Sequence, residues 1–207
     1  PIYDKSADGH YNLISALHKS VRGSDPDAAL YYLARMLDAG EDPLFLARRV
    51  VRMAIEDVGL ADPRAWSLAL QAWDTYERLG SPEGDLALAE VAIYLAVAAK
   101  SNAAYAAFGA VRAEVSASGT LDVPLHLRNA PTKLLRGLGY GRGYQYDHDL
   151  DGGVALDQQC LPDALAGREF YAPTERGLEG RMREKLTALR AARRAAAKGD
   201  APVPDAP

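Results

Sequence analysis

Four dipeptides that place a capping side chain directly before proline divide the first half of the chain. They are Asp25-Pro26, Asp42-Pro43, Asp62-Pro63 and Ser81-Pro82. An Asp or Ser at the N-cap accepts a hydrogen bond from a free backbone amide, and proline suits the first helical position. A glycine, which adopts positive φ readily, stands where each preceding helix would end: Gly23, Gly40, Gly59 and Gly80. The pattern predicts antiparallel helices joined by short loops, and therefore an all-α fold.

Apolar residues at helical spacing give these helices approximate bounds. We expect helices over residues 10–21 (capped by Asp8), 26–39, 43–58, 63–79, 86–99 and 103–115. On the first of these, the residues expected to face inward are Tyr11, Ile14, Leu17 and Val21. Trp66 and Trp73 lie seven positions apart, and therefore on one helix face, which we interpret as core rather than as a ligand platform.

The stretch from Leu86 to Phe108 is predicted to be the centre of the fold. Between Leu86 and Ala99 only Glu90 carries a charge, and a helix that is apolar nearly all round is buried on all sides. The apolar run is shorter than the roughly 20 residues that a membrane span needs. Other helices of the chain, or a second copy of it, would surround this helix. The candidate residues for such a core or subunit interface are Leu86, Leu88, Val91, Ile93 and Leu95.

The second half of the chain has weaker patterns. We expect a loop at 116–120, extended chain at 122–127, a short helix from about 131 to 138 and a basic last helix at 179–197. Residues 139–177 show no periodicity, so they form either a packed arm anchored by tyrosines or a partly mobile segment. The predicted organisation is one helical domain over 1–198, with a main bundle at 1–118, a subregion at 119–198 and a disordered Ala/Pro tail at 199–207.

Several kinds of catalytic site have no signature in this sequence. The phosphate-loop pattern G-x-x-x-x-G-K-[ST] does not occur, and the four histidines are scattered. The adjacent carboxylates of Glu56 and Asp57 point about 100° apart on a helix, so we interpret them as a cap or salt bridge. We therefore predict no catalytic, metal or cofactor residue in this chain. The single cysteine, Cys160, excludes an internal disulfide and is typical of a reducing cytosol.

Basic residues interleaved with tyrosines form a candidate DNA contact. The cations are Arg128, Lys133, Arg136 and Arg142, and no acidic residue lies between the first and the last. Tyr140 and Tyr144 lie nearby, and cations beside aromatic rings suit a phosphate backbone with stacked bases. A solvated basic face is the alternative interpretation. The basic residues of the last helix are a second candidate.

Six segments, in order, carry a family resemblance. They read YDKS at 3–6, ISALHKSVRGSDPDAALY at 14–31, EDVGLADP at 56–63, KSN at 100–102, HLRNAPT at 126–132 and PTERGLEG at 173–180. With them the chain resembles the C-terminal part of the RarA (MgsA) family, which comprises bacterial AAA+ ATPases related to Werner helicase-interacting protein. Ala99 departs from the proline that is usual in this family before Lys-Ser-Asn.

The resemblance implies a helical fold like the C-terminal collar of clamp-loader subunits, assembled as a homotetramer. It implies that the ATPase motifs, with ATP and Mg, lie upstream, and the start at Pro1 indicates a cut inside a longer protein. The implied partners are gapped or single-stranded DNA and single-stranded DNA-binding protein, in a cytoplasmic, nucleoid-associated setting and not at a membrane. We predict an oligomerisation and interaction module of an ATPase acting in replication, recombination and stalled-fork repair. The alternative is a stand-alone helical nucleic-acid-binding module.

Overall fold

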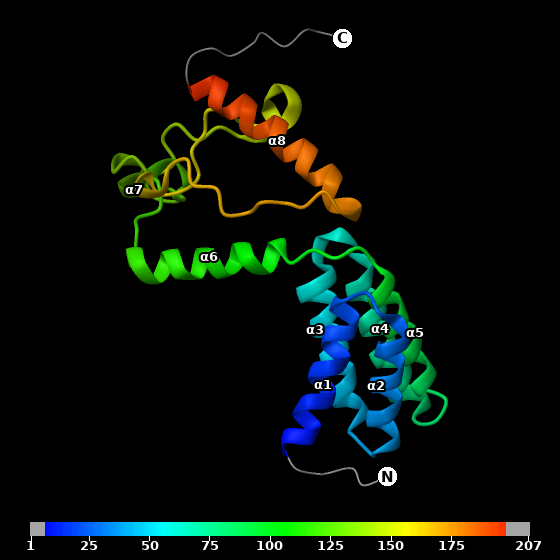
Figure 1. Cartoon of the computed structure of the whole chain (residues 1–207). Coiled ribbons are helices and arrows are strands. Elements are labelled where there is room, and N and C mark those ends of the chain that lie inside the picture. Colours follow the sequence, from blue (N-terminus) through cyan, green and yellow to red (C-terminus); the bar gives the residue numbers. More distant parts are fainter. Residues whose placement is uncertain (1–6, 198–207) are drawn as a thin grey trace. The chain divides into compact units, whose positions relative to one another are not determined.

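A computed structural model describes residues 7–197 (Figure 1). Within that range the chain forms eight α-helices and no strand, which confirms the all-α prediction. No helix between residues 7 and 197 is long and apolar enough to cross a bilayer. The segment YDKS at 3–6, the start at Pro1 and the tail at 199–207 lie outside the described residues.

The helices follow the predicted order with small shifts of their ends. Their bounds are α1 Ala7–Arg22, α2 Pro26–Asp38, α3 Pro43–Met53, α4 Arg64–Leu79, α5 Asp85–Val97, α6 Ala103–Ser118, α7 Lys133–Gly137 and α8 Gly177–Ala197. The chain continues from α3 as a π-helical turn, η1 (Ala54–Val58), and a 3-10 turn, η2 (Gly59–Ala61). The first helix starts earlier than predicted, and therefore Asp8 lies within it rather than before it.

Two of the four predicted proline caps are confirmed. The Asp25 carboxylate accepts a hydrogen bond from the Ala28 amide at 2.9 Å, and α2 begins at Pro26. The Asp42 carboxylate accepts one from the Leu44 amide, also at 2.9 Å, and α3 begins at Pro43. Both aspartates have extended backbone, as an N-cap requires.

The helices predicted over 63–79 and 86–99 begin at Arg64 and Asp85, so neither starts at the proline of its dipeptide. Helix α4 begins at Arg64, because the Asp62 carboxylate binds both the amide and the side chain of that residue. Helix α5 begins at Asp85 because residues 80–84 form a separate turn, closed by a hydrogen bond from the Gly84 amide to the Gly80 carbonyl. At the end of α1 the residue with positive φ is Ser24 rather than the predicted Gly23.

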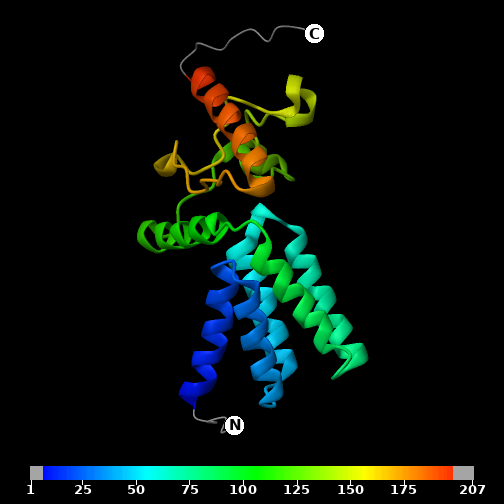
Figure 2. The same ribbon diagram turned by 45° about the vertical axis from the view of Figure 1, so that its right-hand side comes forward.

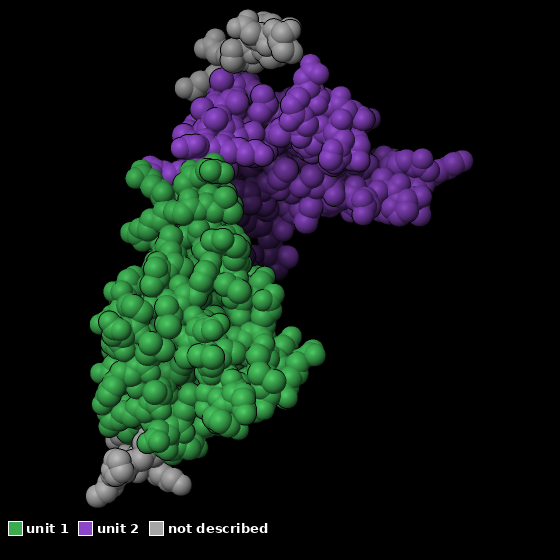
Figure 3. All heavy atoms as spheres, turned by 90° about the vertical axis from the view of Figure 1, so that its right-hand side faces the viewer, with its two compact units in different colours: residues 1–107, 171–182 green, residues 108–170, 183–207 purple. Residues whose placement is uncertain are grey.

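The chain is organised in two compact units (Figure 3). Unit 1 comprises residues 1–107 and 171–182, and unit 2 comprises residues 108–170 and 183–207. The division passes within α6 and within α8. The two units differ in how many of their apolar side chains are buried.

Unit 1 is a bundle of five helices, α1 to α5, around one hydrophobic core (Figure 2). Helix α5 packs against each of the other four, so the prediction of a central helix is confirmed. Its Leu88, Val91 and Leu95 are buried together with Leu17 and Val21 of α1. Tyr11 and Trp66, both predicted to lie in the core, are instead 71% and 54% exposed.

Two of the five α5 candidates lie on a different face from the core. Leu86 is 64% exposed and Ile93 is 38% exposed, while the helix turns the other three inward. Val97, also on α5, is 69% exposed. Residues 86, 93 and 97 are spaced at seven and four positions, so they share one face of the helix. Helix α5 is therefore central but leaves one apolar face uncovered in the single chain.

Unit 2 contains little regular structure within residues 119–170. A 3-10 turn, η3 (Leu125–Leu127), replaces part of the predicted extended stretch. Helix α7 begins at Lys133, later than predicted, because the Thr132 hydroxyl caps it by accepting from the Leu135 amide at 3.3 Å. The predicted irregular segment contains three further 3-10 turns: η4 (Asp147–Asp149), η5 (Asp151–Gly153) and η6 (Asp163–Leu165).

Candidate functional site

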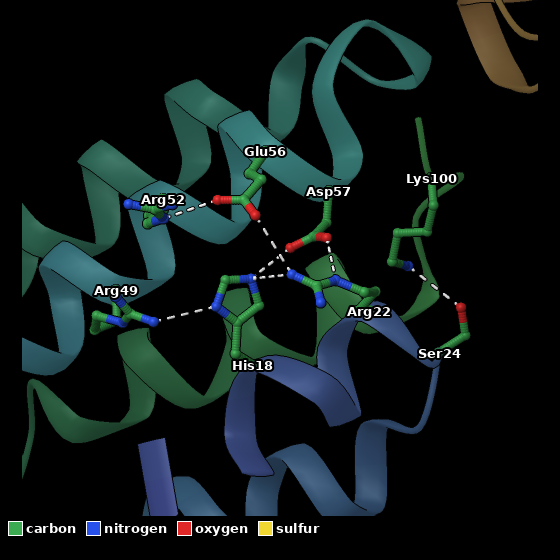
Figure 4. Close-up of polar contacts among 8 residues, drawn as sticks. All are labelled: His18, Arg22, Ser24, Arg49, Arg52, Glu56, Asp57 and Lys100. Atoms are coloured by element: carbon green, nitrogen blue, oxygen red, sulfur yellow. Dashed lines mark hydrogen bonds and ion pairs between the residues drawn. The ribbon is translucent and has the colours of Figure 1, made fainter. Parts of the chain in front are cut away.

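The turn that follows α3 carries two carboxylates, those of Glu56 and Asp57, which lie among side chains of α1 and α3 (Figure 4). Glu56 and Asp57 lie in the π-helical turn η1, a type of distortion that is frequent at functional sites. Gly59 follows with φ of 53°, and a Cβ at this position would lie 2.6 Å from the Ser101 carbonyl oxygen. The Ser101 amide donates to the Asp57 carbonyl at 2.8 Å, so the 100–102 segment is tied directly to this turn.

Asp57 is the buried centre of the cluster, with 6% of its surface exposed. Its carboxylate accepts hydrogen bonds from His18 Nε2 and from Arg22 Nε, each at 2.6 Å. Burial by itself would raise the pKa of Asp57, but the bonds from His18 and Arg22 outweigh it and lower the pKa below its usual value. Asp57 therefore stays ionised and holds both α1 side chains in place.

Histidine 18 is held from both sides of its ring. When Nε2 carries the proton that is donated to Asp57, Nδ1 is an acceptor, and Arg49 Nη2 lies 3.3 Å from it (Figure 4). Arg49 comes from α3 and His18 from α1, so this contact crosses between the two helices.

Glu56 collects a second set of arginines. Its carboxylate accepts from Arg52 Nε at 2.8 Å, one turn earlier on α3, and lies 3.4 Å from Arg22 Nη2. Arg22 is thus shared between both carboxylates, and its pKa is raised, above all by the hydrogen bond to Asp57. The interpretation of Glu56 and Asp57 as salt-bridge residues is confirmed by these contacts.

The histidine and the two carboxylates also bring three metal-ligating types together. The ligand atoms of His18, Glu56 and Asp57 lie within 4.8 Å of one another. Arg22 contacts all three residues, at 3.2 Å, 3.4 Å and 2.6 Å respectively. The guanidinium places a positive charge beside these ligand atoms, and the contacts among the four side chains form an ion-pair network.

Lys100 and Arg176 extend the cluster. Lys100 Nζ donates to the carbonyls of Ala96 and Ala98 at the end of α5, at 2.8 and 2.6 Å, where the negative end of the helix favours a cation. Burial lowers the pKa of Lys100, and nearby Asp57 opposes that shift. Arg176 Nη1 donates to the Lys100 carbonyl at 3.1 Å, which brings the PTERGLEG segment to the same end of unit 1.

A fully buried carboxylate anchors that segment. Glu179, in the first turn of α8, accepts from the Tyr171 hydroxyl at 2.7 Å and the Thr174 hydroxyl at 2.6 Å. Burial would raise the pKa of Glu179, but hydrogen bonds from Ser101, Thr174 and Tyr171 lower it. Tyr171 has a raised pKa for the matching reasons, burial first and its bond to Glu179 second. The resembling segments at 14–31, 56–63, 100–102 and 173–180 thus meet in one place.

The predicted DNA contacts lie elsewhere, in unit 2. Arg128 donates to the Val123 carbonyl at 2.6 Å and lies over the Tyr140 ring, 5.2 Å from its centroid. The other three members, Lys133, Arg136 and Arg142, have exposed side chains. Arg128 therefore has a structural contact in the chain, while the remaining three are accessible to a partner.

The sequence patterns do not predict the polar cluster of unit 1. The histidines are scattered along the sequence, yet His18 lies 39 positions before Asp57 with its Nε2 only 2.6 Å from a carboxylate oxygen of that residue. The available signal was the resemblance itself, because four of its segments carry polar residues that an ordinary helical core does not need. Periodicity could not bring them together, since it says nothing about which helix ends meet.

Comparison with known proteins gives a consistent relationship over most of the chain. Residues 23–190 match the family described as MgsA AAA+ ATPase C terminal. Replication-associated recombination protein A of Coxiella burnetii is 59% identical over 184 residues, which are 89% of this chain and 42% of that protein. The protein of the same name in Escherichia coli K12 is 52% identical over 187 residues, 90% of this chain and 42% of that one.

A eukaryotic relative matches as well. The ATPase WRNIP1 of Dictyostelium discoideum is 46% identical over 170 residues, which are 82% of this chain and 19% of that protein. The chain thus spans less than half the length of these curated relatives. The matched range includes the whole polar cluster of unit 1 except His18 and Arg22. The chain belongs to the MgsA family of AAA+ ATPases and corresponds to its C-terminal region.

Proposed function

We propose that this chain is the oligomerisation and interaction module of an ATPase that acts in replication-associated recombination and stalled-fork repair. The name of the bacterial relatives contains replication-associated recombination, which supports that part of the proposal. The observation that carries the assembly role is the large amount of apolar side chain that unit 2 leaves exposed. The ATPase domain, with its ATP and Mg, would lie outside this chain.

Unit 2 has almost no interior of its own. Among its described residues, Ala155 is the one buried apolar residue. Leu134 is 72% exposed, Phe108 66% and Val115 60%. Burying one such side chain fully contributes about 1.5–3 kcal/mol, so an assembly that covered several of them would be strongly favoured. A second copy of the chain is the occupant that we propose, because each copy carries the same surface and self-complementary contacts close into symmetric assemblies.

The uncovered face of α5 offers a further contact of the same kind. Leu86 and Val97 are more than half exposed on a helix whose opposite face lies in the core of unit 1. Two separate apolar surfaces on one chain suit a homotetramer with two kinds of interface, since a dimer uses only one. Stable interfaces of this class bury about 2,000 Å² or more.

Light scattering tests the assembly directly. We expect a mass of four times the 22.3 kDa of one chain at micromolar concentration. The variant Phe108→Ser with Leu134→Ser should lower that mass, because it removes two exposed apolar side chains from unit 2. The matched control is Tyr31→Ser, a 59% exposed residue of α2 in unit 1. A monomeric wild-type chain would contradict the proposal.

A second candidate function is contact with gapped or single-stranded DNA through Lys133, Arg136 and Arg142. The exposure of these three side chains favours it, with Arg128 and its stacked Tyr140 behind them. One copy makes few phosphate contacts, but several copies in a tetramer would raise the effective concentration on one strand. Single-stranded DNA-binding protein is the protein partner we expect, in the cytoplasm at the nucleoid.

We expect the chain by itself to hydrolyse no ATP and to show no micromolar affinity for it. The reason is the missing phosphate-loop sequence. Calorimetry with ATP and Mg, and a phosphate-release assay, measure both points. Turnover would instead favour a self-contained enzyme.

A further inference from the structure

A cleft of about 330 Å³ lies between α1 and the C-terminal part of α3 in unit 1. Four cationic side chains line it: Lys19 and Arg22 from α1, and Arg49 and Arg52 from α3. The carboxylate on its lining is that of Glu56. The wall of the cleft therefore carries a net positive charge even after this carboxylate is counted, and such a concave surface concentrates anions.

The carboxylates orient two of the arginines without covering them. Arg52 binds Glu56 through Nε, and Arg22 binds Asp57 through Nε, while the side chains stay 56% and 51% exposed. A guanidinium carries five N–H groups arranged as a planar fork. Arg22 also contacts His18 and Glu56 through Nη2, so among the described residues Nη1 of Arg22 and both Nη atoms of Arg52 remain to bind a ligand. Lys19 adds an exposed ammonium on the α1 side.

Arg49 provides an independent observation. Its Nε is buried and has no hydrogen-bond partner among the described residues. Its Nη2 lies against His18 Nδ1, which fixes the direction of the side chain. Buried donors are nearly always paired in native structures, and a charged donor most of all. The buried Nε cannot itself reach a ligand, but Arg49 has no carboxylate partner among the described residues, so its charge adds to the positive charge of the cleft.

We propose that this cleft binds a phosphate group, carried either by a nucleic-acid backbone or by a free phosphate compound. Arginine forks match phosphate oxygens in geometry and charge, and carboxylates behind them hold the forks in position. The site is separate from the Arg128 cluster of unit 2 and requires no assembly. Its failure in a binding assay is thus distinguishable from the failure of the tetramer, which is measured as a mass.

The test uses the complete 207-residue chain and two probes. Pyrophosphate is titrated by calorimetry, and a labelled oligothymidylate is titrated by fluorescence anisotropy at low and high salt. The cleft variant is Lys19→Gln with Arg52→Gln. The matched control is Arg48→Gln with Arg78→Gln, which removes the same charge from exposed positions on α3 and α4 outside the cleft.

We expect the cleft variant to weaken binding of at least one probe about tenfold, since it removes two charge-assisted contacts. For the oligothymidylate, the dependence of log K on log salt should become shallower by about 1.4. The control should stay within about twofold of wild type. Binding of pyrophosphate alone identifies a free phosphate compound as the source, and binding of oligothymidylate alone identifies the backbone.

The single variant Lys19→Gln guards against misfolding, because it leaves every described ion pair intact. It should keep the wild-type melting temperature and still lose part of the binding. No binding of either probe by the wild-type chain overturns the proposal. So does equal loss in the cleft variant and the control, or binding that the cleft variant retains in full.

Discussion

The two units of this chain bury their apolar side chains to different extents. Unit 1 encloses one hydrophobic core among five helices, and an ionic cluster around the buried Asp57 joins α1 to the end of α3. Unit 2 exposes most of its large apolar side chains and makes its described ion pairs at partly exposed positions. Unit 1 therefore has a core of its own, whereas the exposed apolar side chains of unit 2 are what motivates the proposal that it contacts a second copy of the chain.

The largest effect that separates the units concerns their ion pairs. Asp57→Ala should lower the free energy of unfolding by about 3–5 kcal/mol, because it removes the carboxylate that binds His18 and Arg22 and leaves the Arg22 charge without that partner. In unit 2, Asp122 is 98% exposed and lies 3.5 Å from Arg128. Asp122→Ala should change the free energy of unfolding by less than about 1 kcal/mol. Denaturant titrations of both variants measure the contrast, and similar losses would contradict it.

Apolar truncations should separate the units next. Leu17 is fully buried, and Leu17→Ala should cost about 2–5 kcal/mol at any protein concentration. Leu134 is 72% exposed, so Leu134→Ala should change stability only where chains are assembled. Unfolding monitored over a range of protein concentrations distinguishes the two. A concentration-independent loss at Leu134 would mean that unit 2 buries it within one chain.

These contrasts also mark how far sequence reasoning reaches. Helix order, the central helix and the caps at Asp25 and Asp42 follow from local rules, because capping and helical periodicity act over a few neighbouring residues. The pairs at Asp62 and Ser81 have the same residue types, yet their helices begin at Arg64 and Asp85 rather than at the proline. Asp62 is bound by the Arg64 side chain and by the Tyr94 hydroxyl from α5, a contact from outside its own helix start.

The site lies further from local rules. His18 and Asp57 are buried in contact, yet nothing in their own neighbourhoods pairs them. The π-helical turn that places Asp57 depends on the packing at the end of α3, and the close approach of Gly59 to Ser101 depends on two distant segments. The predictions for Tyr11 and Trp66 are wrong because the pattern assigns any aromatic residue on an apolar helix face to the core, whereas both side chains are exposed.

Acid should weaken unit 1 through the same cluster. The pKa of Asp57 is lower in the folded chain than its ordinary value of 3.8, so its ionised form contributes stability above that value. This contribution is lost as pH falls through the lower folded pKa. Glu179 acts in the same direction from its ordinary 4.5. Unfolding free energies between neutral pH and about pH 3 should fall less in Asp57→Asn than in wild type, and parallel curves would contradict the assignment.

The smallest expected effect distinguishes the two basic surfaces. Lys133→Glu with Arg136→Glu in unit 2 should weaken oligothymidylate binding and make its salt dependence shallower by about 1.4, without changing the mass in light scattering. The stems of these side chains could instead cover apolar surface, and the variant would then melt at a lower temperature with its affinity unchanged. Combining this variant with Lys19→Gln and Arg52→Gln completes a cycle. Additive losses in log K would show that the units bind separate phosphates of one strand, because sites without shared partners act independently. If the combined variant loses no more affinity than the unit 2 variant alone, the cleft does not bind DNA and its ligand is a free phosphate compound. Equal, salt-insensitive binding by all variants would mean that neither surface contacts DNA.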